Sequence, residues 1–383
     1  MRNIVIGIVI GVVVGVMIGA TVVAPRLEQA RQNTPLPEVE PNVPGAENLN
    51  LSEDQNKTPV PKPISRLRLI TMFPAKMPIL GELAQRLKRA IPTASGGRLG
   101  VNVFDSGALV DADDTLAAVA SGTADALFSV PGQWDPDDPT LQLFTAVPFG
   151  PDAQEHLAWF YNGGGRELFE NMMKQKGVHA ILCGALPPEA SGWYREPLRN
   201  PESFKHKNIR AFGLGGDVLA KMGANVVRLD ASDILAQFEQ GQLDGAEYSL
   251  PSIDAELGFQ KFARNYYFPG WHQPVTLLTL AINSEVWKNF PARDRDAITA
   301  VCGDNVRYAM AQADAEQFEA LKKLGLAGVQ IRRWPDDILQ ALESAWKDVV
   351  REHTQQDKNF ANAWNSLQKF RRDYGIWHEI SRF

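Results

Sequence analysis

An arginine next to a glycine-rich turn is the feature of this sequence that most directly suggests chemistry. Residues 208–219 read Asn-Ile-Arg-Ala-Phe-Gly-Leu-Gly-Gly-Asp-Val-Leu, so a short strand carrying Arg210 enters a turn that opens a helix. The free N–H groups at a helix start favour an anion, and a guanidinium in an apolar strand is costly unless a carboxylate pairs with it. Val218 stands where the dinucleotide fingerprint G-x-G-x-x-G needs Gly or Ala. We therefore expect Arg210 to hold a carboxylate, either of a ligand or of an internal acid.

A second set of residues is rich in oxygen donors. Glu247 and Tyr248 lie at the end of a predicted strand. Glu189 lies in a Pro-rich loop after the predicted strand 180–183, and Gln273 follows an aromatic segment. Carboxylates, an amide and nearby backbone carbonyls together suit a hard cation such as Na⁺ or Ca²⁺. The alternative for each carboxylate taken singly is a solvated position on the surface.

The sequence contains no recognisable catalytic set. It has no G-x-S-x-G, H-E-x-x-H, P-loop or C-x-x-C pattern, and of six histidines only His272 lies near the proposed site. The two cysteines, Cys183 and Cys302, are able to form a disulfide outside the cytoplasm, but the sequence leaves their pairing open. With 39 Lys+Arg against 45 Asp+Glu and a net charge of -6, nucleic acid is not an expected partner.

The N-terminal segment is apolar and is followed by a proline-rich stretch. Residues 4–24 carry no charge and include glycines at every fourth position from Gly7 to Gly19. This length favours a transmembrane anchor over residues 1–24, with a cleaved signal segment as the alternative. Residues 25–64 contain eight prolines and no hydrophobic periodicity, which indicates a linker. On either interpretation the remainder of the chain lies outside the cytoplasm.

From residue 67 the pattern alternates between strands and helices. The spacing of apolar residues predicts a strand over 68–73, a helix over 79–91 and a strand over 99–104. Strand, helix and strand in succession are typical of an α/β fold with a largely parallel sheet.

One segment of this α/β region has a second, similar copy. Residues 114–126 and 233–245 both read Asp-x-Leu-Ala-x-apolar-x-x-Gly-x-x-Asp-small. In each copy we expect an Asp N-cap, a Gly that ends a short helix, and an Asp that leads into a strand. Ligands of open α/β sheets bind beyond the carboxyl ends of the strands, so two such units predict two similar lobes that face one cleft. The alternative is a chance likeness of two amphipathic helices.

The C-terminal region is predicted to be helical. Its apolar spacing and its Pro and Gly positions indicate three helices, over 291–326, 338–351 and 360–374. These helices are expected either to brace the two lobes or to form a dimer contact. The two-lobed domain is expected to span 65–383, with lobe one mainly at 65–150, lobe two mainly at 185–270 and C-terminal helices at 291–383.

Residues 66–383 resemble the extracytoplasmic solute-binding subunits of tripartite ATP-independent periplasmic (TRAP) transporters, and most of all the branch that binds 2-oxo acids such as pyruvate. Five segments carry the resemblance: Phe-Thr-Ala-Val-Pro-Phe-Gly at 144–150, Ala-Trp at 158–159 with Gly-Gly-Gly at 163–165, the turn at 209–218, Gly-x-x-Asp-Gly-Ala-Glu at 241–247, and Tyr-Tyr-Phe-Pro-Gly-Trp at 266–271. The resemblance implies an α/β, two-lobed periplasmic solute-binding fold with a ligand cleft between the lobes and a long connecting helix.

The resemblance also implies roles for particular residues. Arg210 matches the arginine that binds the ligand carboxylate in the family, and Glu247-Tyr248 matches a Glu-Trp pair. A Gln stands in the family where this chain has Glu189, and a Glu where it has Gln273, a swap that keeps the formal charge of the site. The expected ligand-binding residues are Arg210, Glu189, Phe73, Trp271 and Tyr248, and the expected cation ligands are Glu247, Gln273 and Tyr248, with Glu189 also close to the cation.

Two departures from the family concern the walls of the pocket. Phe73 stands where close relatives carry Trp, and Ser-Val-Pro-Gly-Gln-Trp at 129–134 replaces a Tyr-rich segment. The expected function is capture of a small carboxylate, a 2-oxo or 2-hydroxy acid bound with Na⁺ or Ca²⁺, and its delivery to TRAP membrane subunits. The protein is expected to be extracytoplasmic and membrane-tethered, with a homodimer as one expected assembly. The alternatives are an extracytoplasmic lyase or dehydrogenase acting on small carboxylates, and a sensor module.

Overall fold

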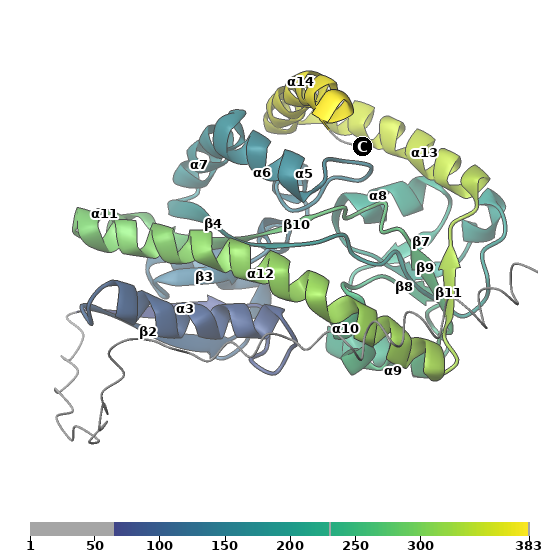
Figure 1. Cartoon of the computed structure of the whole chain (residues 1–383), viewed down its shortest axis with the longest axis horizontal. Helices are drawn as coiled ribbons and strands as arrows, with labels where there is room; N and C mark the ends of the chain where they lie inside the picture. Colours follow the sequence, from purple (N-terminus) through teal and green to yellow (C-terminus); the bar gives the residue numbers. More distant parts are fainter. Residues whose placement is uncertain (1–64, 230, 382–383) are drawn as a thin grey trace, which may run out of the picture. The chain divides into compact units, whose positions relative to one another are not determined.

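The computed structural model describes residues 65–229 and 231–381 (Figure 1). These residues belong to the compact unit Val60–Phe383. The expected anchor over 1–24 and the expected linker over 25–64 lie outside the described residues. Within the described part of the chain, no helix combines the length and the apolar composition needed to span a membrane.

The first of two sheets has five strands in the order β2-β1-β3-β10-β4. Strand β1 runs parallel to its neighbours β2 and β3, whereas β10 runs antiparallel to both β3 and β4. The largely parallel sheet expected from the sequence is therefore confirmed, because β1, β2, β3 and β4 share one direction and, among the described strands of this sheet, β10 alone runs against them. The strands are Ser65–Thr71 (β1), Leu99–Asp105 (β2), Ala126–Ser129 (β3), Val178–Leu186 (β4) and Thr276–Asn283 (β10).

The second sheet has six strands in the order β11-β9-β5-β8-β6-β7. Strand β6 lies between β7 and β8 and is parallel to both, while β5 is antiparallel to β8 and β9. The strand predicted after Asp244 is short, because only Gly245 and Ala246 pair and Glu247 and Tyr248 lie beyond its end. The strands are Gly192–Tyr194 (β5), Asn208–Arg210 (β6), Asn225–Val227 (β7), Gly245–Ala246 (β8), Asn265–Phe268 (β9) and Gln330–Arg333 (β11).

Helices cover both sheets, and one of them runs past the two (Figure 1). The long α12 packs against α3 and β4 of the first sheet and against α10 beside the second. It extends over Ala292–Leu326, which confirms the predicted long helix. The other helices are Leu80–Ala94 (α3), Thr115–Ser121 (α4), Pro139–Leu143 (α5), Ala153–Asn162 (α6), Gly165–Gln175 (α7), Gly213–Lys221 (α8), Ala231–Glu239 (α9), Pro251–Leu257 (α10), Ser284–Asn289 (α11), Asp336–Gln356 (α13) and Lys358–Ser381 (α14).

The repeated segment forms the same unit in each sheet. Helix α4 leads into β3 of the first sheet and α9 leads into β8 of the second. In the first unit the Asp125 carboxylate accepts a hydrogen bond of 2.7 Å from the backbone N–H of Arg68, in the middle of β1 and one residue before its pairing with β3 begins. In the second, Asp244 accepts one of 2.9 Å from the N–H of Asn208, at the start of β6. The matching aspartates therefore join each unit to the neighbouring parallel strand at the same point.

Two details of the repeated unit differ in how well the sequence predicted them. The helix-ending glycines are confirmed, because Gly122 and Gly241 have φ angles of 83° and 72°, in the left-handed region. The expected Asp N-caps are wrong. Asp114 precedes α4 but its side chain makes no capping hydrogen bond, and Asp233 lies inside α9.

A disulfide joins the first sheet to the long helix. Cys183 of β4 is bonded to Cys302 of α12, which settles the pairing that the sequence left open. Beside it, the Asn305 side chain of α12 donates a hydrogen bond of 2.9 Å to the backbone oxygen of Cys183. A covalent bond and a buried hydrogen bond thus fix α12 onto β4, the strand that leads to Glu189.

His156 of α6 is a buried titratable group remote from the site. Its ring is fully buried beside Trp159, with ring centroids 5.5 Å apart, and neither ring nitrogen has a hydrogen-bond partner among the described residues. Burial, reinforced by the positive charge of Arg371, lowers the pKa of His156 to about 3. The folded protein therefore holds this ring neutral at every pH near neutrality.

Acidification should destabilise the protein through His156. The ring binds a proton in the unfolded chain near pH 6.5 but in the folded chain only near pH 3. Its stabilising contribution is complete above about pH 6.5 and is lost as the pH falls, by up to about 1.4 kcal/mol per pH unit. Denaturant unfolding is measured for the wild type and for His156→Phe at pH 7, 6 and 5, and the free energy of unfolding of the wild type relative to that of the variant should fall as the pH falls.

The wild type and His156→Phe have to be compared because buried carboxyl groups change the stability with pH in the direction opposite to His156. Burial raises the pKa of Asp254 to about 7, so acidification stabilises the fold through that group. Its contribution is common to both proteins and cancels in their difference. Replacing the exposed His206 by Phe is the matched control and should leave the pH dependence unchanged. Equal slopes for the wild type and His156→Phe would contradict the assignment.

Candidate ligand and cation site

A small cavity lies between the two sheets, where several of their strands end. The volume open to the centres of water molecules is about 60 Å³. The first sheet and its helix α3 contribute mostly apolar side chains, and the second sheet and the connecting loops contribute mostly polar ones. The lining residues are Phe73, Leu80, Val130, Gln133, Leu186, Glu189, Arg210, Phe212, Tyr248, Ser249, Gln273 and Thr276.

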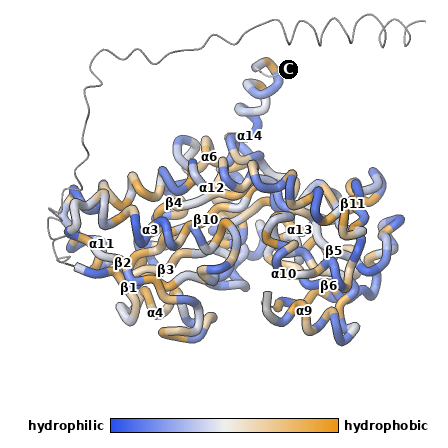
Figure 2. The backbone as a smooth tube through the Cα atoms, turned by 60° about the horizontal axis from the view of Figure 1, so that its bottom comes forward, coloured by the Kyte–Doolittle hydropathy of each residue, from blue (hydrophilic) through white to orange (hydrophobic). Residues whose placement is uncertain are grey.

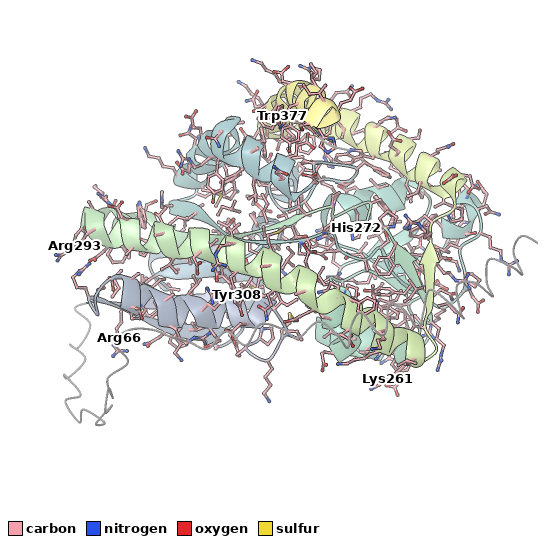
Figure 3. The ribbon with its side chains drawn as sticks, in the orientation of Figure 1. Arg66, Lys261, His272, Arg293, Tyr308 and Trp377 are labelled. Carbon is pink, nitrogen blue, oxygen red and sulfur yellow. A yellow bond between two sulfur atoms is a disulfide. The ribbon has the colours of Figure 1, made fainter. Side chains whose placement is uncertain are left out.

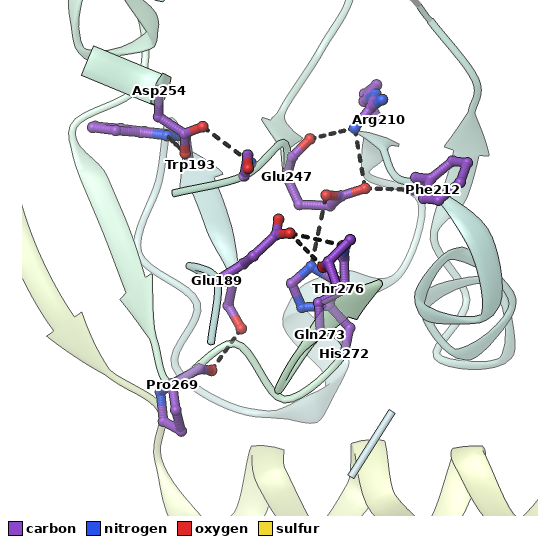
Figure 4. Close-up of polar contacts among 12 residues, drawn as sticks. Glu189, Trp193, Arg210, Phe212, Glu247, Asp254, Pro269, His272, Gln273 and Thr276 are labelled. Carbon is purple, nitrogen blue, oxygen red and sulfur yellow. Dashed lines mark hydrogen bonds and ion pairs between the residues drawn. The ribbon is translucent and has the colours of Figure 1, made fainter. Parts of the chain in front are cut away.

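Arg210 is the last residue of β6 and enters the cavity from the second sheet (Figure 4). Its Nη1 donates to the backbone oxygen of Glu247 at 2.6 Å and to Glu247 Oε1 at 3.1 Å, and its Nε donates to the backbone oxygen of Leu229 at 3.1 Å. Its Nη2 makes no hydrogen bond to the described residues. The guanidinium thus pairs with an internal carboxylate, one of the two alternatives that the sequence left open, and its role toward a ligand stays a prediction.

Glu247 follows β8 directly and is only 2 % exposed. Its Oε1 accepts hydrogen bonds from Arg210 and, at 2.5 Å, from the backbone N–H of Phe212 in the turn before α8. Its Oε2 has no hydrogen-bond partner among the described residues and lies 3.6 Å from His272 Nε2. One carboxylate oxygen is thus fixed by the turn that the sequence marked as an anion site, and the other is free.

Glu189 is the second buried carboxylate of the site and is 3 % exposed. Its Oε1 accepts hydrogen bonds from Thr276 Oγ1 at 2.5 Å and from Gln273 Nε2 at 3.3 Å, while its Oε2 has no partner. Burial, together with the negative charges of Glu247 and Asp254, raises the pKa of Glu189 well above its usual range. The site therefore holds two carboxyl groups, and the negative charge of one makes ionisation of the other less favourable.

The loops that carry Glu189 and Gln273 approach each other closely. The backbone N–H of Glu189 donates to the backbone oxygen of Gln273 at 3.1 Å. A Cβ atom on Gly270 would lie only 2.0 Å from the backbone oxygen of Glu189, so only glycine fits there. Residues expected from separate loops are therefore brought to one point, as Figure 4 shows.

The oxygens left without partners fit a hard cation. Glu189 Oε2, Glu247 Oε2 and Gln273 Oε1 are all buried and accept no hydrogen bond in the described part of the chain. Buried polar atoms are normally satisfied, and carboxylate and amide oxygens are the donors that Na⁺ and Ca²⁺ prefer. The described residues contain no group of three or more His, Cys, Asp or Glu placed to hold a metal, so a cation at this point needs the amide oxygen of Gln273 among its donors.

Tyr248 and Phe73 line the cavity as predicted, but Trp271 does not. The Trp271 ring stacks on Phe149, with centroids 5.5 Å apart, and its backbone oxygen accepts a hydrogen bond from the Phe149 N–H. The expected contact between Trp271 and the ligand is therefore corrected, because the ring fills the core behind the site. The Tyr248 ring lies 5.3 Å from Arg210 Cζ, and burial raises the pKa of its hydroxyl to about 12, so it presents a neutral phenol.

Several residues of the site were missed by the sequence reasoning. Thr276 begins an apolar strand, and its hydroxyl is what holds Glu189 in place. Asp254 is fully buried and accepts hydrogen bonds from Trp193 Nε1, from the Tyr266 hydroxyl and from the backbone N–H of Ser249. It fixes the segment that carries Tyr248. A polar residue at each end of an otherwise apolar strand is the signal that could have identified Thr276; no local pattern marks Asp254.

His272, labelled in Figure 3, is buried inside the molecule and is 4% exposed. It packs against the N-terminus of α8, where a Cβ atom on Gly215 would come within 2.8 Å of His272 Cβ. Its ring nitrogens make no hydrogen bond in the described part of the chain. The predicted position near the cleft is thus correct, and the ring lies behind Glu247 and does not line the cavity.

Two sheets with a charged cavity between their strand ends are typical of a protein that binds a small ligand. Residues 71–357 match the model of bacterial extracellular solute-binding proteins, family 7, and the chain belongs to this family. The chain is 27% identical over 320 residues to a monocarboxylate 2-oxoacid-binding periplasmic protein of Nostoc sp., a match that covers 83% of this chain and 87% of the relative.

Solved structures of TRAP solute-binding proteins have the same fold. One of them, from Bordetella bronchiseptica, is described as a mixed-occupancy dimer with calcium and picolinate in its active site. It has a TM-score of 0.80 and 27% identity, and the match covers 83% of this chain and 95% of the Bordetella chain. Another, from Pseudoalteromonas atlantica, has bound sodium and pyruvate. It has a TM-score of 0.79 and 28% identity, and the match covers 82% of this chain and 96% of the Pseudoalteromonas chain. The prediction of a TRAP solute-binding protein, as opposed to an enzyme, is confirmed.

Proposed function

We propose that the chain captures a small monocarboxylate, a 2-oxo or 2-hydroxy acid, together with Na⁺ or Ca²⁺. The observation that carries the proposal is the set of buried, unpartnered oxygens beside Arg210: Glu189 Oε2, Glu247 Oε2 and Gln273 Oε1. The 2-oxoacid-binding relative and the neighbours with bound calcium or sodium support it.

The charges of the cavity favour a ligand with one carboxylate. Arg210 is the one Lys or Arg among the described residues that line it. A second carboxylate on the ligand would be buried without a cationic partner, at a high cost in desolvation. The rest of the wall is apolar and suits a short carbon chain.

The size of the cavity favours a short ligand. The volume open to the centres of water molecules is about 60 Å³, against the roughly 10–15 Å³ that a single buried water needs. The space therefore admits a small molecule, and we take an acid of three or four carbons as the ligand.

Each group has a separate task in this proposal. Arg210 Nη2 binds the ligand carboxylate, while Nη1 keeps Glu247 oriented. The free oxygens of Glu247, Glu189 and Gln273 hold the cation, and the cation supplies the positive charge that a 2-oxo or 2-hydroxyl oxygen requires. Thr276 and the Phe212 N–H fix the two carboxylates. Closure of the two sheets on the ligand would then favour the state that docks on the membrane subunits of the transporter.

Ligand binding should depend on both Arg210 and the cation. In a thermal-shift and calorimetry panel of 2-oxo and 2-hydroxy acids, the wild type should bind monocarboxylates more tightly with Na⁺ or Ca²⁺ than after treatment with a chelator in sodium-free buffer. Arg210→Ala should lose about 2–5 kcal/mol of binding free energy, because a buried charge loses its partner. Glu247→Gln should weaken the dependence on the cation.

Controls separate loss of binding from loss of folding. Arg332→Ala, at a position outside the cavity, should bind as the wild type does. The melting temperature of each variant without ligand reports on its fold. Wild-type affinity in Arg210→Ala would show that the arginine is structural, and full binding by Glu247→Gln in the absence of added cation would refute the cation site.

We propose further that residues 1–24 tether this periplasmic protein to the inner membrane. The 21 uncharged residues from position 4 to 24 support this, since they suffice for a membrane span. After expression of the full chain with its own N-terminus, the protein should remain in the membrane fraction after high-salt washing, and a version that replaces 1–24 with a cleavable signal peptide should be released by osmotic shock. A mature N-terminus that begins near residue 25 would instead establish cleavage.

The C-terminal helix supports the proposal of a homodimer. The last part of α14 extends away from its neighbouring helices (Figure 2) and carries Ile376, Trp377 and Ile380, each at least 60% exposed. Exposed apolar side chains of this size, gathered on one helix, are typical of a contact surface. A second copy of the chain is the proposed occupant, and the dimeric Bordetella bronchiseptica relative supports that choice.

Light scattering after size-exclusion chromatography tests the dimer. The wild type at micromolar concentration should have twice the mass of one chain. Combined replacement of Ile376, Trp377 and Ile380 by Ser should produce a monomer, because the apolar contact area is lost. Arg372→Ser on the same helix is the control and should stay dimeric. A monomeric wild type would refute the proposal.

A further inference from the structure

The wall that the first sheet gives to the cavity contains two polar side chains, Thr276 and Gln133, among apolar ones. The apolar residues of this wall are Phe73, Leu80, Val130 and Leu186. Thr276 bonds to Glu189 and Gln273, which also bond to each other. Gln133 stands outside that network, because its side chain makes no hydrogen bond to the described residues.

The backbone at Gln133 is held firmly. It lies in the short turn Pro131–Gln133 after β3. The neighbouring Gly132 donates to Thr145 Oγ1 at 2.7 Å and accepts from Gln142 Nε2 at 2.9 Å, and the Gln133 N–H donates to the backbone oxygen of Val130 at 3.1 Å. The side chain therefore cannot find a partner by movement of its own turn.

The Oε1 atom of Gln133 is buried and has no partner. An amide oxygen in such a position costs free energy unless a donor reaches it. Gln133 lines the cavity that is the proposed ligand site, so the donor is expected on a ligand, on the carbon chain away from its carboxylate. It must be uncharged, because the apolar wall offers no acid to pair with an ammonium group and no base to pair with a second carboxylate.

We propose that Gln133 determines specificity by accepting a hydrogen bond from a hydroxyl on the side chain of the ligand. The preferred ligands are therefore hydroxylated 2-oxo monocarboxylates of three or four carbons. This inference rests on the proposed function, since it needs the carboxylate on Arg210 to direct the ligand's carbon chain toward the first sheet. The apolar neighbours Phe73 and Val130 then contact the carbon atoms, and Gln133 reads the hydroxyl.

Two pairs of acids test the inference, each pair differing by one hydroxyl: pyruvate against 3-hydroxypyruvate, and 2-oxobutanoate against 4-hydroxy-2-oxobutanoate. Their dissociation constants are measured by calorimetry on the full chain with saturating Ca²⁺ or Na⁺. At least one hydroxylated acid should bind about tenfold or more tightly than its parent, which is the scale of one buried hydrogen bond. In Gln133→Leu this preference should disappear, while the parent acid binds at least as well as before.

Gln260→Leu is the matched control. Gln260 Oε1 is also buried without a partner in the described chain, but this residue lies outside the cavity, so its replacement should keep the preference for the hydroxyl. Parent acids that bind with no gain from either hydroxyl would overturn the inference and leave the proposed function intact. A preference that survives in Gln133→Leu would also overturn it. The absence of binding by all four acids would overturn both.

Discussion

The site is organised by the burial of two carboxylates beside a single guanidinium. Glu189 and Glu247 are both almost fully buried, and only Glu247 is paired with Arg210. Two acids and one base leave one negative charge in excess when both acids are ionised, and a bound monocarboxylate adds another. Buried charge of one sign is expensive, so anion and cation are each poorly accommodated alone. The two ligands are therefore expected to bind cooperatively, each making the site more favourable for the other.

The rest of the fold holds these charges in place. Arg210 and Glu247 end neighbouring parallel strands, and the turn after β6 supplies the Phe212 N–H to one carboxylate oxygen. Glu189 follows β4, which a disulfide and a hydrogen bond fix to the long α12. The hydroxyl of Thr276, at the start of β10, completes the arrangement. Every charged group of the site thus lies at or just beyond the end of a strand, where the backbone is still held by its sheet.

Much of this arrangement could be predicted because strand ends are visible in the sequence. Arg210 and Glu247 each stand where an apolar run gives way to a turn, and parallel neighbours bring such positions together. The paired aspartates and glycines of the two repeated units were also visible, although the capping role expected of the aspartates was wrong. What local patterns cannot show is the return of β10 to the first sheet, which makes that sheet mixed. For the same reason Thr276 was missed and Trp271, which faces the core, was placed in the pocket.

The two matching units also differ in an instructive way. Both end at the cavity, but the one in the second sheet delivers charged residues and the one in the first delivers an apolar turn with a single amide. In the proposed function, the unit in the second sheet thus binds the carboxylate of the ligand, and the similar unit in the first sheet contacts its carbon chain. During evolution, the turn at 130–133 can vary without disturbing the charge balance across the cavity. Related proteins can therefore change their ligand specificity through one short loop, while the residues that bind the carboxylate stay the same.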